Sequence, residues 1–370
     1  MKNFKKIFSF AVIFLVFCVC SLVTYKIVRW KMYIWLPDYI AGQLRRADPE
    51  PNLIHIIFLM VDHYEPGRGE KGAKINQEWL DRYKELASRH KDSYGRVPQH
   101  SWFYAYEQKN ELVMPELARA VRDGYGEIEF HWHHGNGNNA EFPAKLAEGV
   151  AWFNQYGAMI DAQGKKSFAF IHGDWSLDNS GGREFCGVTR ELEILKSLGC
   201  YGDFTFPAFG NIAQPRKVNS IYYASDDDQS KSYDTGIEAR VGVHNDKDLM
   251  VFEGPITIKD YGAIEIDPFP GHGDIDSLIK ANVHVSGRPE WVFVKTFTHG
   301  VQSKKIFFNT VVDDIFSYLE MKYKNNKYKL HYVTAREAYN IVSAAEDGMG
   351  GDPNSYLNYK INKPVSALID

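Results

Sequence analysis

Histidines gather in one short stretch of this sequence, His131-Trp132-His133-His134. In a β-strand the residues at i and i+2 point to one face, so His131 and His133 present their imidazoles together. His134 faces the other side unless the strand ends before it, which Gly135 permits. Either His133, which we prefer, or His134 therefore pairs with His131. This spacing predicts a metal site, with Zn²⁺ favoured and other divalent ions left open.

Polar side chains also follow three other expected strands: Asp62 and His63 after 54–61, His172, Asp174 and Trp175 after 167–171, and His299 at the end of 291–299. The active residues of α/β barrels lie at the carboxyl ends of the strands. We therefore expect these residues to converge on one site, with His63 as a further metal ligand. The alternative is that the histidines line a polar surface or make hydrogen bonds without a metal.

The elements that must position these residues alternate between strand and helix. Apolar runs predict strands at 54–61, 100–106, 127–133, 167–171, 201–206 and 291–299. Amphipathic patterns predict helices at 79–89, 114–123, 145–159, 189–198 and 305–323. This order favours an α/β fold, a distorted (β/α) barrel, over residues 51–345. An insertion is expected around 208–290, and a tail at 346–370.

The first thirty residues predict a membrane anchor. Residues 7–25 are nineteen residues without a charge, preceded by lysines and followed by lysine and arginine. A helix of that length spans roughly 28 Å, close to the ~30 Å hydrocarbon core of a bilayer. A cleaved signal peptide is the alternative. Residues 31–50 are interpreted as a juxtamembrane linker, with interfacial anchors at Trp30, Tyr33 and Trp35. Positive charge on both flanks leaves the orientation open.

Composition excludes several classes of protein. The chain has 370 residues, of which 44% are hydrophobic and 24% charged, which indicates a globular domain and not a disordered one. Its net charge of −4 argues against a dedicated nucleic-acid-binding protein. Cys186 and Cys200 flank the helix expected at 189–198, which holds their sulfurs roughly 20 Å apart, too far for a disulfide.

The order of these motifs resembles the polysaccharide deacetylase (NodB-homology) superfamily, whose domain is a distorted (β/α) barrel. Asp62-His63 stands where that family has two aspartates, and His131 leads its metal histidines. The segment from His172 to Trp175 resembles the third motif of the family, with His172 in the place of an arginine. Thr298-His299 resembles its late histidine. The histidine at 63, the closer spacing of the metal histidines and the histidine at 172 indicate a divergent branch.

The resemblance implies a metal-dependent hydrolase that removes N-acetyl groups from a cell-surface polysaccharide or its precursor. Asp62 would act as the base and His299 as the acid, around Zn²⁺ held by His63, His131 and His133 or His134. Substrate contacts would come from His172, Asp174, Trp175 and Trp132. A carbohydrate is thus the expected partner, and the domain is expected outside the cytoplasm, where surface glycans are processed.

Two other functions remain open at this point. The chain can be a metal-dependent hydrolase of another C–N bond, because a fold does not fix a function. It can also be a non-catalytic, membrane-tethered glycan-binding protein on the same fold. For single residues, His299 can instead be a fourth metal ligand or a hydrogen-bonded rim residue, and Trp132 and Trp175 can belong to the core. Metal content and acetate release separate the three functions.

Overall fold

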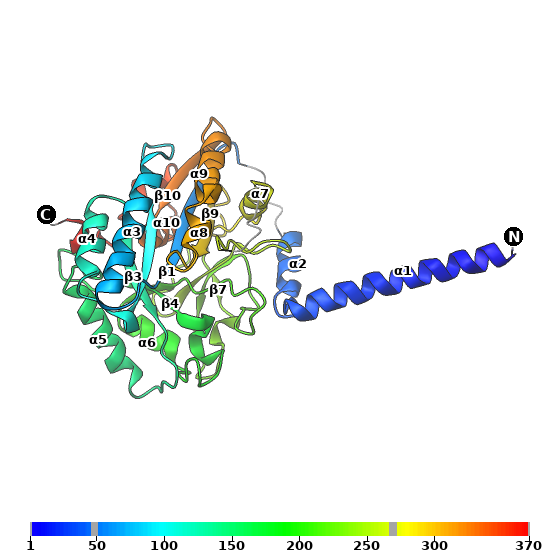
Figure 1. Cartoon of the computed structure of the whole chain (residues 1–370), viewed down its shortest axis with the longest axis horizontal. Coiled ribbons are helices and arrows are strands. Elements are labelled where there is room, and N and C mark those ends of the chain that lie inside the picture. The colour runs from blue at the N-terminus through cyan, green and yellow to red at the C-terminus, as the bar shows by residue number, and fades with distance from the viewer. Residues whose placement is uncertain (1, 46–50, 266–271, 369–370) are drawn as a thin grey trace.

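The computed structural model describes residues 2–45, 51–265 and 272–368. A long N-terminal helix, α1 (Lys2–Arg29), extends away from an α/β domain (Figure 1). From Ile7 to Arg29 this helix is long and apolar enough to cross a membrane, and none of it is buried in the protein. A signal sequence has the same features. The sequence prediction of an apolar membrane-spanning helix is confirmed to that extent.

Ten strands form one mostly parallel sheet in the order β10-β1-β2-β3-β4-β5-β8-β6-β7, with β9 paired to β1. Only the pairs of β6 with β7 and with β8 are antiparallel. Within the described residues no strand ladder joins β7 to β9, so the ladders establish a sheet and not the expected barrel. The strands are β1 (Ile54–Tyr64), β2 (His100–Ala105), β3 (Gly126–Trp132), β4 (Phe168–His172), β5 (Cys200–Asp203), β6 (Ser220–Ala224), β7 (Ile237–Glu238), β8 (Leu249–Glu253), β9 (Trp291–Thr298) and β10 (Tyr328–Val333).

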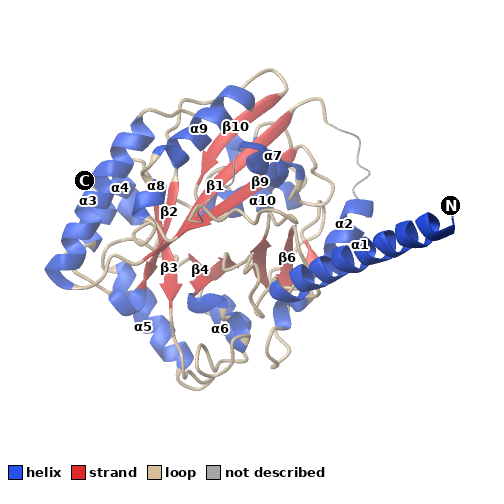
Figure 2. Ribbon diagram, turned by 45° about the vertical axis from the view of Figure 1, so that its right-hand side comes forward, coloured by secondary structure: helices blue, strands red, loops and turns tan. Residues whose placement is uncertain are grey.

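Helices α3, α4 and α5 lie beside β1, β2 and β3 (Figure 2). The amphipathic pattern of each of these three helices places one apolar stripe against the sheet. The apolar side chains of α10 belong instead to a second cluster, with Leu59 and Val61 of β1. The helices of the domain are α2 (Leu36–Arg45), α3 (Gly69–Ser88), α4 (Met114–Arg122), α5 (Phe142–Asn154), α6 (Glu191–Ser197), α7 (His272–Lys280), α8 (Lys304–Phe307), α9 (Thr310–Lys322) and α10 (Ala335–Glu346).

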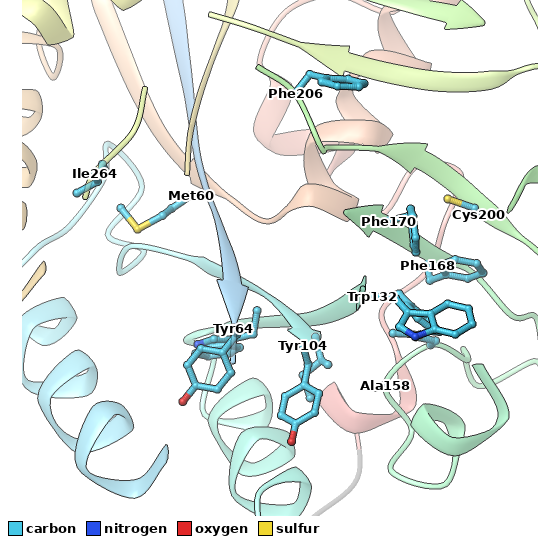
Figure 3. Packing of buried hydrophobic residues seen from close by; sticks show 14 of the residues in the cluster. Met60, Tyr64, Tyr104, Trp132, Ala158, Phe168, Phe170, Cys200, Phe206 and Ile264 are labelled. Atoms are coloured by element: carbon cyan, nitrogen blue, oxygen red, sulfur yellow. The ribbon is translucent and has the colours of Figure 1, made fainter. Parts of the chain in front are cut away.

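The two faces of the sheet are set by strand alternation. In β1, Phe58, Met60 and Tyr64 belong to the cluster that contains the side chains of α3, and we call this the outer face. Leu59 and Val61 belong to a separate cluster, and we call this the inner face. Figure 3 shows the outer cluster across neighbouring strands, where it includes Met60, Tyr64, Tyr104, Trp132, Phe168 and Phe170.

The segment after α1 is folded against the domain. Trp35 is fully buried, with its ring centroid 5.9 Å from that of Phe209. Trp30 and Tyr33 remain 40% and 53% exposed. Trp35, which we expected to be an interfacial anchor, is therefore part of a small core of the domain, while Trp30 and Tyr33 keep the exposure that such an anchor needs.

Most expected elements are present with shifted ends. The helix expected at 79–89 begins ten residues earlier as α3, and the helix expected at 305–323 is divided into α8 and α9. The region 208–290 contains β6, β7 and β8, which complete one side of the sheet. Beyond the expected elements, β10 and α10 close the chain, and the capping box of Thr334 and Glu337 begins α10. Cys186 and Cys200 are free in the described structure, as expected.

Candidate metal centre

Glu65, His131 and His133 bring one ligand atom each to within 4.8 Å of one another. Glu65 directly follows β1, and His133 directly follows β3, so the group lies at the carboxyl ends of these strands. Glu65 Oε1 is 3.4 Å from His131 Nε2 and 3.8 Å from His133 Nε2. The i, i+2 spacing of the two histidines places both on the inner face, as the sequence predicted.

Hydrogen bonds fix the orientation of each ligand. His131 Nδ1 lies 2.9 Å from the carbonyl oxygen of Ile171, and His133 Nδ1 lies 2.5 Å from Glu107 Oε1. Both imidazoles therefore direct Nε2 toward Glu65. Partners of this kind on the far nitrogen are a regular feature of metal-binding histidines. Two imidazole nitrogens and one carboxylate oxygen are also a donor set of catalytic zinc sites, which keep a fourth position for water or substrate. The residues present thus fit a divalent metal ion.

The carboxylates and imidazoles of this site each stabilise the charged form of the other, which shifts their pKa values. Burial raises the pKa of Glu65, but the hydrogen bond and charge of His131 outweigh burial and hold this pKa below its ordinary 4.5. Burial likewise lowers the pKa of His133, but the hydrogen bond with Glu107 outweighs it and raises this pKa above 6.5. The carboxylates are consequently ionised near neutral pH and attract cations to the site.

His63 and His299 form the second part of the centre. Their rings are stacked, with centroids 4.4 Å apart, and the His63 ring also meets the edge of His131 at 4.8 Å. Burial and the neighbouring imidazoles of His299 and His131 hold the pKa of His63 well below 6.5. His63 is thus a neutral, buried ring between two others. His63, which we expected to be a metal ligand, is not part of the group of ligand atoms formed by His131 and His133. Glu65 completes that group instead.

His299 is held by a carboxylate. Its Nδ1 lies 2.6 Å from Glu265 Oε2, which also accepts the backbone N–H of His299 at 3.0 Å. Burial lowers the pKa of His299, but the hydrogen bond with Glu265 outweighs burial and raises this pKa above 6.5. The raised pKa favours the protonated imidazole, which is the state a general acid requires.

Asp62 faces away from the centre. It is fully buried on the outer face, where Oδ2 lies 2.8 Å from His100 Nε2 and Oδ1 accepts the N–H of Gly300 at 2.7 Å. Adjacent residues in a strand point to opposite faces, so Asp62 cannot share the inner face with His63. The role of base that the resemblance implied for Asp62 therefore has no support in this geometry. Asp62 instead holds the loop that carries His299.

The other predicted site residues are divided between two places. Trp132 is buried in the outer core and stacks on Phe142, with ring centroids 5.4 Å apart. His134 and His172 are buried away from His131 and His133, in a group around Glu191. Asp174 is exposed, and Trp175 is half-buried beside the centre, with its ring 6.2 Å from those of His63 and of His299.

A cavity of about 180 Å³ is lined by Trp175 and Glu265, both of which contact His299. Its walls include Trp175, Phe209, Tyr261, Phe297 and the carboxylate-bearing Glu265. Phe209 and Tyr261 stack with centroids 4.8 Å apart, and the ring centroid of Trp30 lies 5.4 Å from that of Phe209. The cavity therefore lies between the candidate centre and the segment that follows α1.

Three carboxylates of this site were missed from the sequence: Glu65, Glu107 and Glu265. Glu65 could have been identified from the sequence. It lies two residues after His63 at a strand end, so both side chains point to the inner face. Glu107 also follows a strand, β2, but this position alone is weaker evidence for a role in the site. Glu265 lies in the poorly readable region 208–290, where no pattern distinguished it.

The chain matches no protein-family model and no curated protein. The likeness to polysaccharide deacetylases accordingly rests on motif order alone, and function must be argued from the site.

Proposed function

We propose that this chain is a metal-dependent hydrolase that removes N-acetyl groups from a glycan at a membrane surface. The observation that carries the proposal is the convergence of Glu65, His131 and His133. Each is oriented by a further hydrogen bond, and Glu65 Oε2 accepts its bond from Gln302 Nε2 at 2.9 Å. This donor set is typical of zinc sites that catalyse hydrolysis. The motif order adds the substrate class, an N-acetylated carbohydrate.

Hydrolysis adds a water oxygen to the acetyl carbonyl carbon, breaks the C–N bond and delivers a proton to the nitrogen, giving acetate and a free amine. A divalent ion held by Glu65, His131 and His133 would supply Lewis acidity for the carbonyl oxygen and for the attacking water. His299 donates the proton to the departing amine, and Glu265 holds its ring and keeps it protonated. Asp62 keeps the His299 loop in place through Gly300. Since Asp62 faces the outer side, the proton released by the attacking water passes to solvent in this proposal, and not to Asp62.

The aromatic cavity supports a carbohydrate substrate. Trp175 and Tyr261 offer flat apolar surfaces in the wall of this cavity, and aromatic rings of this kind can cover the apolar face of a sugar. The contact of Trp30 with Phe209 brings this cavity close to the end of α1. A glycan held near a membrane is thus within reach of the site.

The proposal also includes a distorted barrel fold and a location of the domain outside the cytoplasm. Isolated bridges join Val283 to Phe293 of β9 and Arg240 to Ser286, so chain segments lie in the gap between β9 and β7. These bridges are single residue pairs and not a continuous strand ladder. They support a distorted barrel in which isolated bridges close the gap between β9 and β7. With α1 as an uncleaved anchor, the domain would work outside the cytoplasm, where surface glycans are processed.

Metal content and acetate release test this function on the full chain purified in detergent. We expect bound divalent metal and release of acetate from N-acetylglucosamine oligosaccharides. His131→Ala should lose metal and activity together, because a site with three protein ligands loses an anchor. His244→Ala is the matched control, since His244 is a surface histidine paired with Asp347. Full activity in the His131 variant would refute the proposal.

The position of Asp62 favours a second candidate, a metal-containing glycan-binding protein without catalysis. Asp62, to which the resemblance assigned the role of base, is paired with His100 on the outer face. Stoichiometric metal and glycan binding without acetate release would support this candidate, and acetate release that depends on His131 would exclude it.

A further inference from the structure

A second group of ligand-type side chains lies on the outer side of β3 and β4. His134, His172, Cys186 and Glu191 each bring one ligand atom to within 4.8 Å of the others, and all four residues are buried. Glu191 Oε1 lies 2.7 Å from His134 Nε2 and 3.7 Å from His172 Nε2, while Cys186 Sγ lies 3.4 Å from Glu191 Oε2. Strand alternation separates this group from His131 and His133, which face inward.

This group includes a buried nitrogen atom that makes no hydrogen bond to the residues that the structure describes. The Nδ1 atom of His172 lies 2.5 Å from the carbonyl oxygen of Gly173, which leaves Nε2 directed at the cluster. That Nε2 atom is buried and has no hydrogen-bond partner among the residues that the structure describes. A buried polar atom without a partner is costly, and in proteins such an atom usually has a ligand, a water or an ion.

The donor types agree with one kind of ligand. A thiolate, two imidazole nitrogens and a carboxylate oxygen are all zinc ligands, and four protein ligands with no open position are the mark of a structural zinc site. Mg²⁺ and Ca²⁺ prefer oxygen ligands only, so a site with sulfur and imidazole disfavours them. Because the whole group is buried, it has no access for a substrate.

We propose that His134, His172, Cys186 and Glu191 bind one Zn²⁺ ion as a structural site separate from the candidate catalytic centre. This inference does not depend on the proposed function, because it uses none of the residues of that centre.

The position of this zinc site in the fold indicates a structural role. His134 follows β3, His172 ends β4, Cys186 lies in the segment 173–190, and Glu191 begins α6. That segment has only two short 3₁₀ turns and carries non-glycine residues in the left-handed region, Asp174, Trp175, Asp178 and Asn179. Such conformations cost energy and persist only when the surroundings fix them. A four-ligand ion would fix this segment, and with it Trp175 at the wall of the cavity.

Cobalt substitution provides the direct test. The full chain is expressed in cobalt-supplemented medium and purified in detergent, and its absorption spectrum is recorded. Thiolate coordination to Co²⁺ gives a near-ultraviolet charge-transfer band that histidine and carboxylate ligands do not give. We expect this band in the wild-type protein and its loss in Cys186→Ser. Cobalt-loaded wild-type protein without the band would overturn the site, whether or not any variant folds.

Two controls separate this site from other parts of the chain. Cys200 is also buried and free, but it lies in β5 with its sulfur near the carbonyl oxygen of Gly202, so Cys200→Ser should keep the band. His131→Ala should keep the band while losing metal from the catalytic centre. In zinc-loaded protein, Cys186→Ser should contain one equivalent of zinc less than the wild type. A band that survives Cys186→Ser, or that disappears in Cys200→Ser, would contradict the assignment.

Discussion

Gly173, which follows β4, lies directly against the imidazole of His133, which follows β3. A Cβ atom at position 173 would overlap Cγ and Cδ2 of that ring. Gly173 has no positive φ, so the requirement for glycine comes from the neighbouring ring and not from the backbone conformation. The absence of a side chain at position 173 therefore allows the His133 ring to occupy its place beside Glu65.

Replacing Gly173 with alanine should weaken metal binding. The added methyl group must displace the His133 ring, because backbone and side-chain atoms cannot overlap. Changes that misplace a ligand typically lower metal affinity by about 10–100-fold. Competition with a chelator measures this affinity. Gly42→Ala is the matched control, because Gly42 lies in α2 with no atom near its Cβ direction. Unchanged affinity in Gly173→Ala would show that His133 is not a ligand.

Replacing His299 with alanine should reduce turnover without loss of metal. Loss of an acid–base group usually costs about 10²–10⁴-fold in rate. His299 contributes no atom to the close group of Glu65, His131 and His133, so metal content measured by atomic spectrometry should be unchanged. Loss of metal together with activity would instead make His299 a ligand.

Replacing Glu265 with glutamine tests the same acid through its partner. The carboxylate of Glu265 raises the pKa of His299, so the neutral amide should let this pKa fall. In the proposed mechanism the reaction needs the protonated imidazole, so the decline of rate at high pH should begin at a lower pH in the variant. A pH–rate profile measures the shift. If the profile does not move, the proton donor is another group.

Strand alternation made part of the site predictable. The spacing of His131 and His133 predicted that both face one side, and the structure brings them together. The same rule, applied to Asp62 and His63, predicts opposite faces, but the resemblance placed both at one site. Glu65 satisfies the rule with His63 and lies with the histidines. The periodicity of two residues was therefore a better guide to the site than motif order.

Other parts of the site depend on contacts that no local pattern encodes. Glu265 reaches His299 from a loop in the region 208–290, where glycine, serine and aspartate leave little periodicity. The two-residue strand β7 is too short to have a period. The burial of Trp35 depends on Phe209, about 170 residues away, and the residues around position 35 look the same whether they meet a bilayer or a protein core.

His90 should make stability depend on pH. Its Nε2 lies 2.8 Å from Asp313 and its Nδ1 lies 3.3 Å from Glu320, both on α9, while Arg89 shares Asp313. Burial lowers the pKa of His90, but the hydrogen bonds and charges of Glu320 and Asp313 outweigh it and raise this pKa above 6.5. The folded state therefore binds the proton more tightly than the unfolded state. This contribution to stability is complete below pH 6.5 and is lost as pH rises through the raised pKa.

His90→Ala should consequently destabilise the protein more at pH 6 than at pH 9. The difference between the two pH values should be about 0.5–1 kcal/mol, since Asp313 is partly exposed and solvent screens the pair. Denaturant unfolding of wild type and variant at both pH values measures it. An equal effect at the two pH values would show that packing alone accounts for the role of His90.

The segment after α1 should be required for a stable domain. Trp35 is fully buried against Phe209, whereas Trp30 is 40% exposed. Trp35→Ala should lower the free energy of unfolding by about 3–5 kcal/mol, the usual cost of truncating a buried aromatic residue. Trp30→Ala is the matched control and should cost clearly less. The two variants differ mainly in the area that each ring buries.

The contact of Trp35 with Phe209 distinguishes two truncations, both of which remove the apolar helix α1. Deletion of residues 1–29 keeps Trp35 and should give a monodisperse soluble domain, because the apolar helix is gone and the small core stays covered. Deletion of residues 1–45 uncovers Phe209, Val218 and Ile256, which form an exposed apolar patch of the kind that promotes aggregation. Size-exclusion chromatography and thermal unfolding of the two proteins compare them directly. If both truncations are equally soluble and equally stable, then Trp35 contributes nothing to the domain, and residues 31–50 behave as a simple linker.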